Sequence, residues 1–179
     1  MARVAVTAFG VDRPGIVAAV TGALVDHDGN LEDTAMTILG GHFAMMLVVS
    51  VPDDHDAGAL EQALAAEVAA LGLTVAVRPL EEEAATTPVA GSSWAVSVHG
   101  ADRPGIVHAV SRLLADHGAN IVDLATRVLG EQVPPAYVML LEVTLAPEAD
   151  VDSLQQDLAA IGSQLGVEVH LRRDDPDIL

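Results

Sequence analysis

Two copies of one short motif carry the residues of this chain that are best suited to chemistry. Asp12-Arg13-Pro14-Gly15 recurs as Asp102-Arg103-Pro104-Gly105, and an asparagine follows each copy at the same spacing, as Asn30 and Asn120. An aspartate can attract an ammonium group, and a glycine without Cβ lets a ligand approach the start of a helix, where free amides favour an anion. An asparagine amide both donates and accepts hydrogen bonds. Ammonium and carboxylate together describe a free amino acid.

The same residues also have a purely structural interpretation. Asp12 and Asp102 could cap the helices that follow by accepting from the amides of Gly15 and Gly105, while the proline presets φ in the first turn. Asparagine between a helix and a strand is common turn chemistry. Because the motif recurs with an asparagine at the same spacing in both copies, we give the ligand-binding and structural interpretations about equal weight.

The motif belongs to a longer internal repeat that must position it. Residues 10–40 and 100–130 are identical at 17 of 31 positions, and a four-residue insertion around 133–135 predicts a longer turn in the second copy. Hydrophobic periods of two and 3.6 alternate within each copy. They predict a strand at 3–8, a helix from Ile16 to about 28, strands at 31–39 and 43–51, a helix at 60–71 and a strand at 73–77. The second copy repeats this order.

The order β-α-β-β-α-β predicts an α+β protein of two ferredoxin-like modules, each an antiparallel four-stranded sheet with both helices on one face. We expect module 1 at 1–80, a linker at 81–92 that contains an acidic run, module 2 at 93–173 and a tail at 174–179. Apolar residues on both faces of the strands, as at 44–49, indicate that the uncovered sheet face packs against another module or a second copy, so a homodimer is expected.

Composition excludes several classes of protein. The chain has a net charge of −18 and only 2% aromatic residues, which disfavours direct binding to nucleic acid. No apolar stretch is long enough to span a membrane, and the N-terminus does not resemble a signal peptide, so a soluble, cytoplasmic protein is expected. The absence of cysteine rules out disulfides and thiolate chemistry.

Nothing in the sequence points to an enzyme or to a cofactor. The seven histidines show no metal-ligand spacing, and His27 and His117 recur where an imidazolium would favour a helix C-terminus. The acidic segment 53–56 fits a turn and a helix cap better than a cation site. Nucleotide-binding and hydrolase fingerprints are missing. We therefore predict no catalytic residues, no metal and no cofactor.

The repeated Asp-Arg-Pro-Gly-Ile-Val motif, with Asp-His and then Asn after the helix, resembles the ACT domain, an amino-acid-sensing module, and the resemblance covers nearly the whole chain twice. Paired modules of this kind resemble the glycine cleavage repressor family in particular. By position, the resemblance implies a ligand site in each module, with the ligand at an interface between modules. Its residues would be Asp12, Arg13, Gly15, Ile16, Asn30, Asp102, Arg103, Gly105, Ile106 and Asn120.

The resemblance implies an amino-acid-binding regulator that controls transcription of amino-acid metabolism through a transcription factor, without gripping DNA itself. The alternatives are a regulatory subunit of a separate amino-acid or one-carbon metabolic enzyme, a purely structural oligomeriser and an undetected enzyme. Which amino acid binds is open, and so is whether one or both modules bind it. Some ligand-binding members of the ACT family have a polar side chain where this chain has Gly10 and Gly100. The two copies also differ from each other, since His108 replaces Ala18 and Arg127 replaces Thr37.

Overall fold

The computed structural model describes residues 1–80, 91–130 and 134–174, and the chain divides into two compact units, Met1–Thr87 and Pro88–Leu179. We call them module 1 and module 2 and describe each by itself. The expected linker with its acidic run, the inserted turn and the C-terminal tail fall mainly on 81–90, 131–133 and 175–179, which lie outside the described residues.

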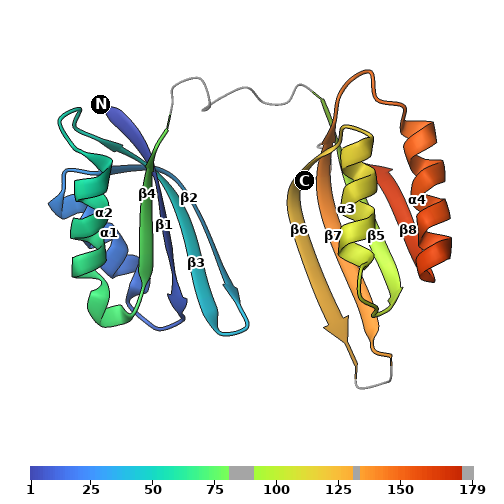
Figure 1. Cartoon of the computed structure of the whole chain (residues 1–179), viewed down its shortest axis with the longest axis horizontal. Coiled ribbons are helices and arrows are strands. Elements are labelled where there is room, and N and C mark those ends of the chain that lie inside the picture. Colours follow the sequence, from blue (N-terminus) through green and yellow to red (C-terminus); the bar gives the residue numbers. More distant parts are fainter. Residues whose placement is uncertain (81–90, 131–133, 175–179) are drawn as a thin grey trace. The chain divides into compact units, whose positions relative to one another are not determined.

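Module 1 has the predicted order of elements, with one short 3-10 helix added before the last strand (Figure 1). Its elements are β1 (Ala2–Val11), α1 (Ile16–Asp26), β2 (Asn30–Leu39), β3 (His42–Val51), α2 (Ala57–Glu67), η1 (Ala69–Leu71) and β4 (Thr74–Pro79). The second helix was expected to continue to residue 71, but the α-helix ends at Glu67. The last turn tightens into η1 and stops at Gly72, whose φ of 66° suits glycine.

Module 2 repeats the arrangement with a longer second helix. Its elements are β5 (Ser92–Ala101), α3 (Ile106–Asp116), β6 (Asn120–Leu129), β7 (Ala136–Leu145), α4 (Val151–Leu165) and β8 (Val167–Arg173). Here the α-helix runs without a break to Gly166, again at a positive φ of 68°.

Each module is a four-stranded antiparallel sheet with its two helices on one face, as the sequence predicts. The strand orders are β2-β3-β1-β4 and β6-β7-β5-β8, and Figure 1 shows the helices on a single side of each sheet. Along β1 and β3 of module 1, every second side chain faces the helices and is buried; Val6, Leu47 and Val49 are 0% exposed. Apolar burial of this kind is the main stabilising contribution to a small domain.

The strands β2 and β6 lie at the sheet edges, and both contain a bulge at the same place. In module 1 the register shifts between Leu31 and Asp33, which leaves Glu32 as the extra residue; in module 2 the extra residue is Val122. All ten residues of β2 are exposed. The predicted Gly40-Gly41 hairpin turn joins β2 to β3, with positive φ at both glycines.

Candidate functional site

The turn between β1 and α1 leaves the start of the helix uncapped. Gly15 is the N-cap residue at φ 94°, and no side chain accepts a hydrogen bond from the first turn of α1. Gly105 has the same geometry at φ 96° in front of α3. The expectation that Asp12 and Asp102 cap these helices is therefore wrong, because the helix begins only at residue 16 or 106 and a left-handed glycine precedes it.

The turn is instead held by its backbone. The Asp12 amide donates to the Gly41 carbonyl at 3.0 Å, and the Asp102 amide donates to the Pro135 carbonyl at 2.9 Å. Each turn is thus held against the end of the neighbouring hairpin. The amides of the first helical turn remain unpaired donors, and together with the positive end of the helix dipole they favour an anion. The glycine is needed for its φ, and the space where its Cβ would lie is open.

A hollow of about 530 Å³ lies at this turn in module 1. Four of the predicted ligand-binding residues line it, namely Asp12, Arg13, Gly15 and Ile16. Its other lining residues are Pro14, Val17, Ala18, Met36 and Phe43. The hollow therefore combines one carboxylate, one guanidinium and a helix start with apolar walls, which is a suitable lining for a zwitterion with an apolar side chain.

Asn30 lies at the opposite end of the module from this hollow. It pairs with Ser50 at the start of β2, whereas the turn after Val11 lies beside His42 and the other end of β2. Ten strand residues separate the two ends by roughly 30 Å. Asn120, which pairs with Thr144, has the same place in module 2. Within one module, the structure does not bring the asparagine and the Asp-Arg-Pro-Gly turn together.

Gly10 and Gly100 have a packing role. A Cβ on Gly10 would lie 2.7 Å from Leu73 Cδ2, and one on Gly100 would lie 2.7 Å from Val167 Cγ1. A side chain at Gly10 would require Leu73 to shift, and one at Gly100 would be crowded by Val167.

The turn of module 2 has a different environment. Arg103 Nη1 donates to the Leu165 carbonyl at 3.5 Å and lies beside Gly166, so this guanidinium lies at the C-terminus of α4. Tyr137 occupies the place of Phe43 and is 6% exposed; its hydroxyl has no hydrogen-bond partner among the described residues. Burial and then the negative charge of Asp102 raise the pKa of Tyr137 above its ordinary value. The predicted residues Asp102, Arg103, Gly105 and Ile106 thus share one turn, with a more polar neighbourhood.

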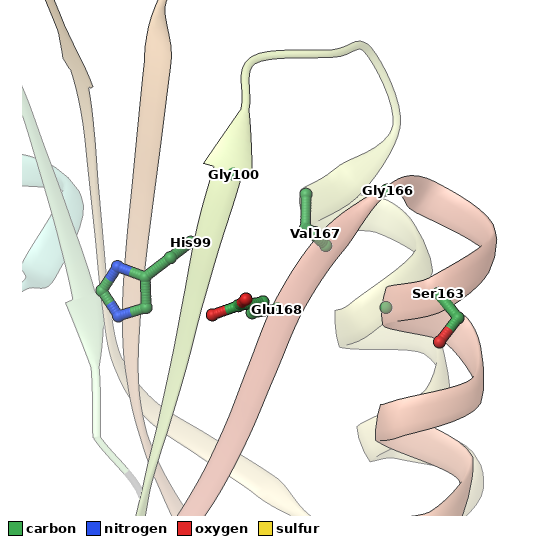
Figure 2. Close-up of a pocket in the computed structure, with 7 residues that line it drawn as sticks. His99, Gly100, Ser163, Gly166, Val167 and Glu168 are labelled. Atoms are coloured by element: carbon green, nitrogen blue, oxygen red, sulfur yellow. The ribbon is translucent and has the colours of Figure 1, made fainter.

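A second hollow, of about 390 Å³, lies between β5, α4 and β8 (Figure 2). Figure 2 shows His99 and Glu168 extending to one side of the strands, while Ser163 lies on α4 at the other side. A base and a hydroxyl must lie within hydrogen-bond reach to act as a catalytic pair. Because His99 and Ser163 extend to opposite sides, they do not form such a pair. Cβ atoms on Gly100 and Gly162 would clash with Val167, so close packing explains these two glycines.

Sequence reasoning missed an interhelical contact that recurs in both modules. His27 Nε2 lies 3.0 Å from Glu67 Oε1, and His117 Nε2 lies 2.9 Å from Asp157 Oδ2. The histidines occupy equivalent positions after α1 and α3, but the carboxylates come from positions one helical turn apart on α2 and α4. The recurrence of histidine in both copies pointed to a shared role. The pair could not be predicted from the repeat because the carboxylate lies at a different position in each copy.

The acidic segment 53–56 has a structural role at the start of α2. Asp56 accepts from the Ala59 amide at 2.8 Å, so the acidic segment 53–56 contains the predicted helix cap. Among the described residues, no group of three or more histidine, aspartate or glutamate side chains is arranged to hold a metal ion. None of the described helices is long and apolar enough to cross a membrane.

Comparison with known proteins identifies the family. The family model for the ACT domain matches residues 2–78 and again residues 95–172. The chain belongs to the ACT domain family. Its two ACT domains correspond to modules 1 and 2.

Some relatives match about half of this chain, and others match nearly all of it. A UPF0237 protein of Methanopyrus kandleri is 42% identical over 80 residues, which is 45% of this chain and 86% of the relative. The glycine cleavage system transcriptional repressor of Escherichia coli is 26% identical over 165 residues, covering 91% of this chain and 85% of the relative.

Among solved structures, an unknown protein from Galdieria sulphuraria matches with a TM-score of 0.80 and 29% identity, covering 97% of this chain and 99% of that one. The chain is thus a tandem ACT protein related to the glycine cleavage repressor.

Proposed function

We propose that this tandem ACT protein is an amino-acid-responsive regulator that controls transcription of amino-acid metabolism through contact with a protein partner. The observation that carries the proposal is the uncapped start of α1 above the hollow of module 1. The relationship to the E. coli repressor over most of both chains supports the regulatory role. The family and these relatives favour a regulator over an enzyme.

The proposed ligand is a free amino acid whose carboxylate accepts from the amides at the start of α1. The macrodipole favours a negative charge there. The Asp12 carboxylate is the proposed partner of the ammonium group, and Met36 and Phe43 would contact the side chain of the ligand. Because Asn30 lies at the far end of the module, its proposed contribution requires a turn supplied by a different module.

Module 1 is the better candidate for binding a ligand with an apolar side chain. Ala18, Met36 and Phe43 of its hollow are replaced in module 2 by His108, Thr126 and Tyr137 at equivalent positions. Arg103 is also bonded to the end of α4, whereas Arg13 lines the hollow. A polar lining suits a polar ligand, so the two modules are proposed to differ in specificity.

Val17→Asp tests the site without removing a structural residue. Val17 is 40% exposed on the first turn of α1, so an aspartate there is accommodated and stabilises the helix start by about 0.3–1 kcal/mol. The same charge repels the ligand carboxylate. Thermal unfolding against a panel of free amino acids should show a rise of several degrees for the ligand with the wild type, because a ligand at about 100 times its Kd adds about 2.7 kcal/mol.

The Val17→Asp variant should lose that rise, while Val107→Asp, the matched change in module 2, should keep it. Val107 is 38% exposed, so the two substitutions are sterically comparable. Loss of the rise in Val107→Asp alone would move the site to module 2. If no amino acid stabilises the wild type, the sensing function is overturned.

The protein partner is tested by affinity capture with the wild type, in the presence and absence of the stabilising amino acid. Recovery of a DNA-binding protein supports control of transcription. Recovery of a metabolic enzyme instead would favour a regulatory subunit. The net charge of −18 supports action through a protein rather than direct contact with DNA.

A further inference from the structure

The sheet of module 1 has an outer face that is turned away from α1 and α2 (Figure 1). Several large apolar side chains of this face are exposed. Phe9 and Val11 of β1 are 53% and 54% exposed, and Met46 of β3 is 57% exposed. These side chains alternate with the buried ones on the same strands. A contiguous apolar surface of this kind marks an interaction site.

The strand registers arrange this outer face in rows of large and small side chains. Each of three successive rows pairs one of each size across β3 and β1: Val48 beside Ala5, Met46 beside Thr7, and Phe9 beside Ala44. The larger residue lies on β3 in the first two rows and on β1 in the third. Each of the two central strands therefore has a protrusion where the other has a depression.

The charges of the outer face are balanced. Asp33 on β2 and Arg78 on β4 lie at the two ends of the row that contains Val48 and Ala5. Beyond that row, Arg3 and Glu32 pair with each other at 2.8 Å. Two acids and two arginines make this face neutral on a chain with a net charge of −18, so it can meet another copy without like-charge repulsion at the contact.

The corresponding face of module 2 keeps the marginal pair, as Asp123 and Arg172, but its centre is more polar. Glu142, His99 and His170 stand where module 1 has Val48, Phe9 and Ala76. Burying such groups without partners is costly, so this face is less suited to a dry contact.

We propose that two copies of the chain form a dimer in which the outer faces of module 1 pack against each other about a twofold axis parallel to the strands. This axis places β3 of one copy over β1 of the other, and β2 over β4. Val48 then meets the partner's Ala5, Met46 meets the partner's Thr7, and Phe9 meets the partner's Ala44. Large side chains meet small ones throughout the centre, and aligned packing of two sheets is a standard arrangement.

The same axis brings opposite charges together at both margins. Asp33 meets the partner's Arg78, and symmetry repeats the contact on the other side. Within its own module, Arg78 Nη1 lies 3.3 Å from Glu61 Oε2 and donates to the Val77 carbonyl at 2.9 Å, but the Arg78 side chain is 75% exposed and an exposed ion pair contributes little. A turn of this side chain toward the partner exchanges these contacts for the one with the partner's Asp33.

The size of the face is adequate for a dimer. Four strands of up to ten residues cover roughly 20 Å by 30 Å, or about 600 Å² in projection. The accessible area of such a corrugated surface is larger than its projection, and about 800 Å² per partner is standard for stable complexes. This inference goes beyond the proposed regulatory function and does not depend on it.

Sedimentation of the full chain over a range of protein concentrations tests the dimer. We expect the wild type to be dimeric at micromolar concentration and Met46→Glu to dimerise at least a hundredfold more weakly, because the new carboxylate faces apolar partners. Leu140→Glu is the matched control, since Leu140 is 52% exposed at the equivalent position of module 2. It should remain dimeric. Unchanged circular dichroism would verify that both variants fold.

Reversal of the marginal charges tests the axis. Asp33→Arg and Arg78→Asp should each weaken the dimer, and the double variant should recover much of the loss, because the reversed charges again meet across the axis. A monomeric wild type, equal effects of Met46→Glu and Leu140→Glu, or no recovery in the double variant would overturn the proposal. The proposal would also be overturned if Ile38→Glu dissociated the dimer while Met46→Glu did not. Ile38 is exposed on the opposite face of β2, so that result would place the interface on the other side of the sheet.

Discussion

Tyr137 shows how a single hydroxyl distinguishes two otherwise equivalent positions. Phe43 fills the same place in module 1, where it is 1% exposed. An unpaired buried hydroxyl costs about 1–3 kcal/mol. We therefore expect Tyr137→Phe to raise the free energy of unfolding of module 2 by about 1 kcal/mol. Urea unfolding followed by the fluorescence of Trp94, the single tryptophan of the chain, measures this module. A loss of stability instead would indicate that the hydroxyl has a partner, such as a bound water.

The same substitution should alter the response to alkali. The pKa of Tyr137 is raised from 10.0, first by burial and then by Asp102. The unfolded state therefore releases the tyrosine proton at lower pH than the native state, so the free energy of unfolding falls as pH rises above about 10. Below that range both states keep the proton and no dependence arises. In Tyr137→Phe this contribution to the fall should vanish; an unchanged slope would contradict it.

For the candidate site, the sequence predicts which residues share one turn, but only partly which other residues surround them. Asp12, Arg13, Gly15 and Ile16 are consecutive or nearly so, so sequence proximity ensures that they share one turn. Their surroundings depend on long-range pairing. Met36 lines the hollow through the sheet register, which no local pattern indicates.

At the scale of elements, replacing glycine by alanine should change the stability of module 1 in opposite directions at the start of α1 and within it. Gly15→Ala should destabilise module 1 by about 1 kcal/mol or more, because Gly15 holds φ 94°, where a Cβ is strained. Gly22→Ala should stabilise it by up to about 1 kcal/mol, since Gly22 lies within the helix with open space around its Cβ position. Thermal unfolding of both variants checks the signs. Equal signs would contradict the role given to Gly15.

The elements themselves could be predicted well because the hydrophobic period and the repeat agree. The bounds and caps were harder. The cap of α1 depends on the φ of Gly15, which a sequence of the form Asp-Arg-Pro-Gly does not determine, and the early end of α2 at Glu67 distinguishes it from α4 despite similar apolar spacing. The bulges at Glu32 and Val122 shift the alternation of their strands by one residue, but β2 is exposed along its whole length, so no buried apolar pattern revealed the shift there.

At the scale of the whole molecule, the two modules have separate cores, so damage to one should spare the other. Leu47→Ala removes a side chain that is 0% exposed and should cost module 1 about 2–5 kcal/mol. Because Trp94 lies in module 2, its fluorescence transition should not move, while circular dichroism should show an earlier first phase. Leu141→Ala, the matched change in module 2, should move the fluorescence transition. A shift of Trp94 in Leu47→Ala would show that the modules unfold together.

The bulges in β2 and β6 affect how readily copies of this protein stack through these edge strands. A long, flat edge strand with exposed apolar residues is a template for stacking into amyloid-like fibres. An extra residue bends such an edge and interrupts its regular run of donors and acceptors. Because Glu32 and Val122 interrupt β2 and β6 at the same place, each copy of the repeat has such an interruption at one of its two sheet edges. We expect these two residues, which lie outside the proposed ligand site, to hinder this form of misassembly at those edges.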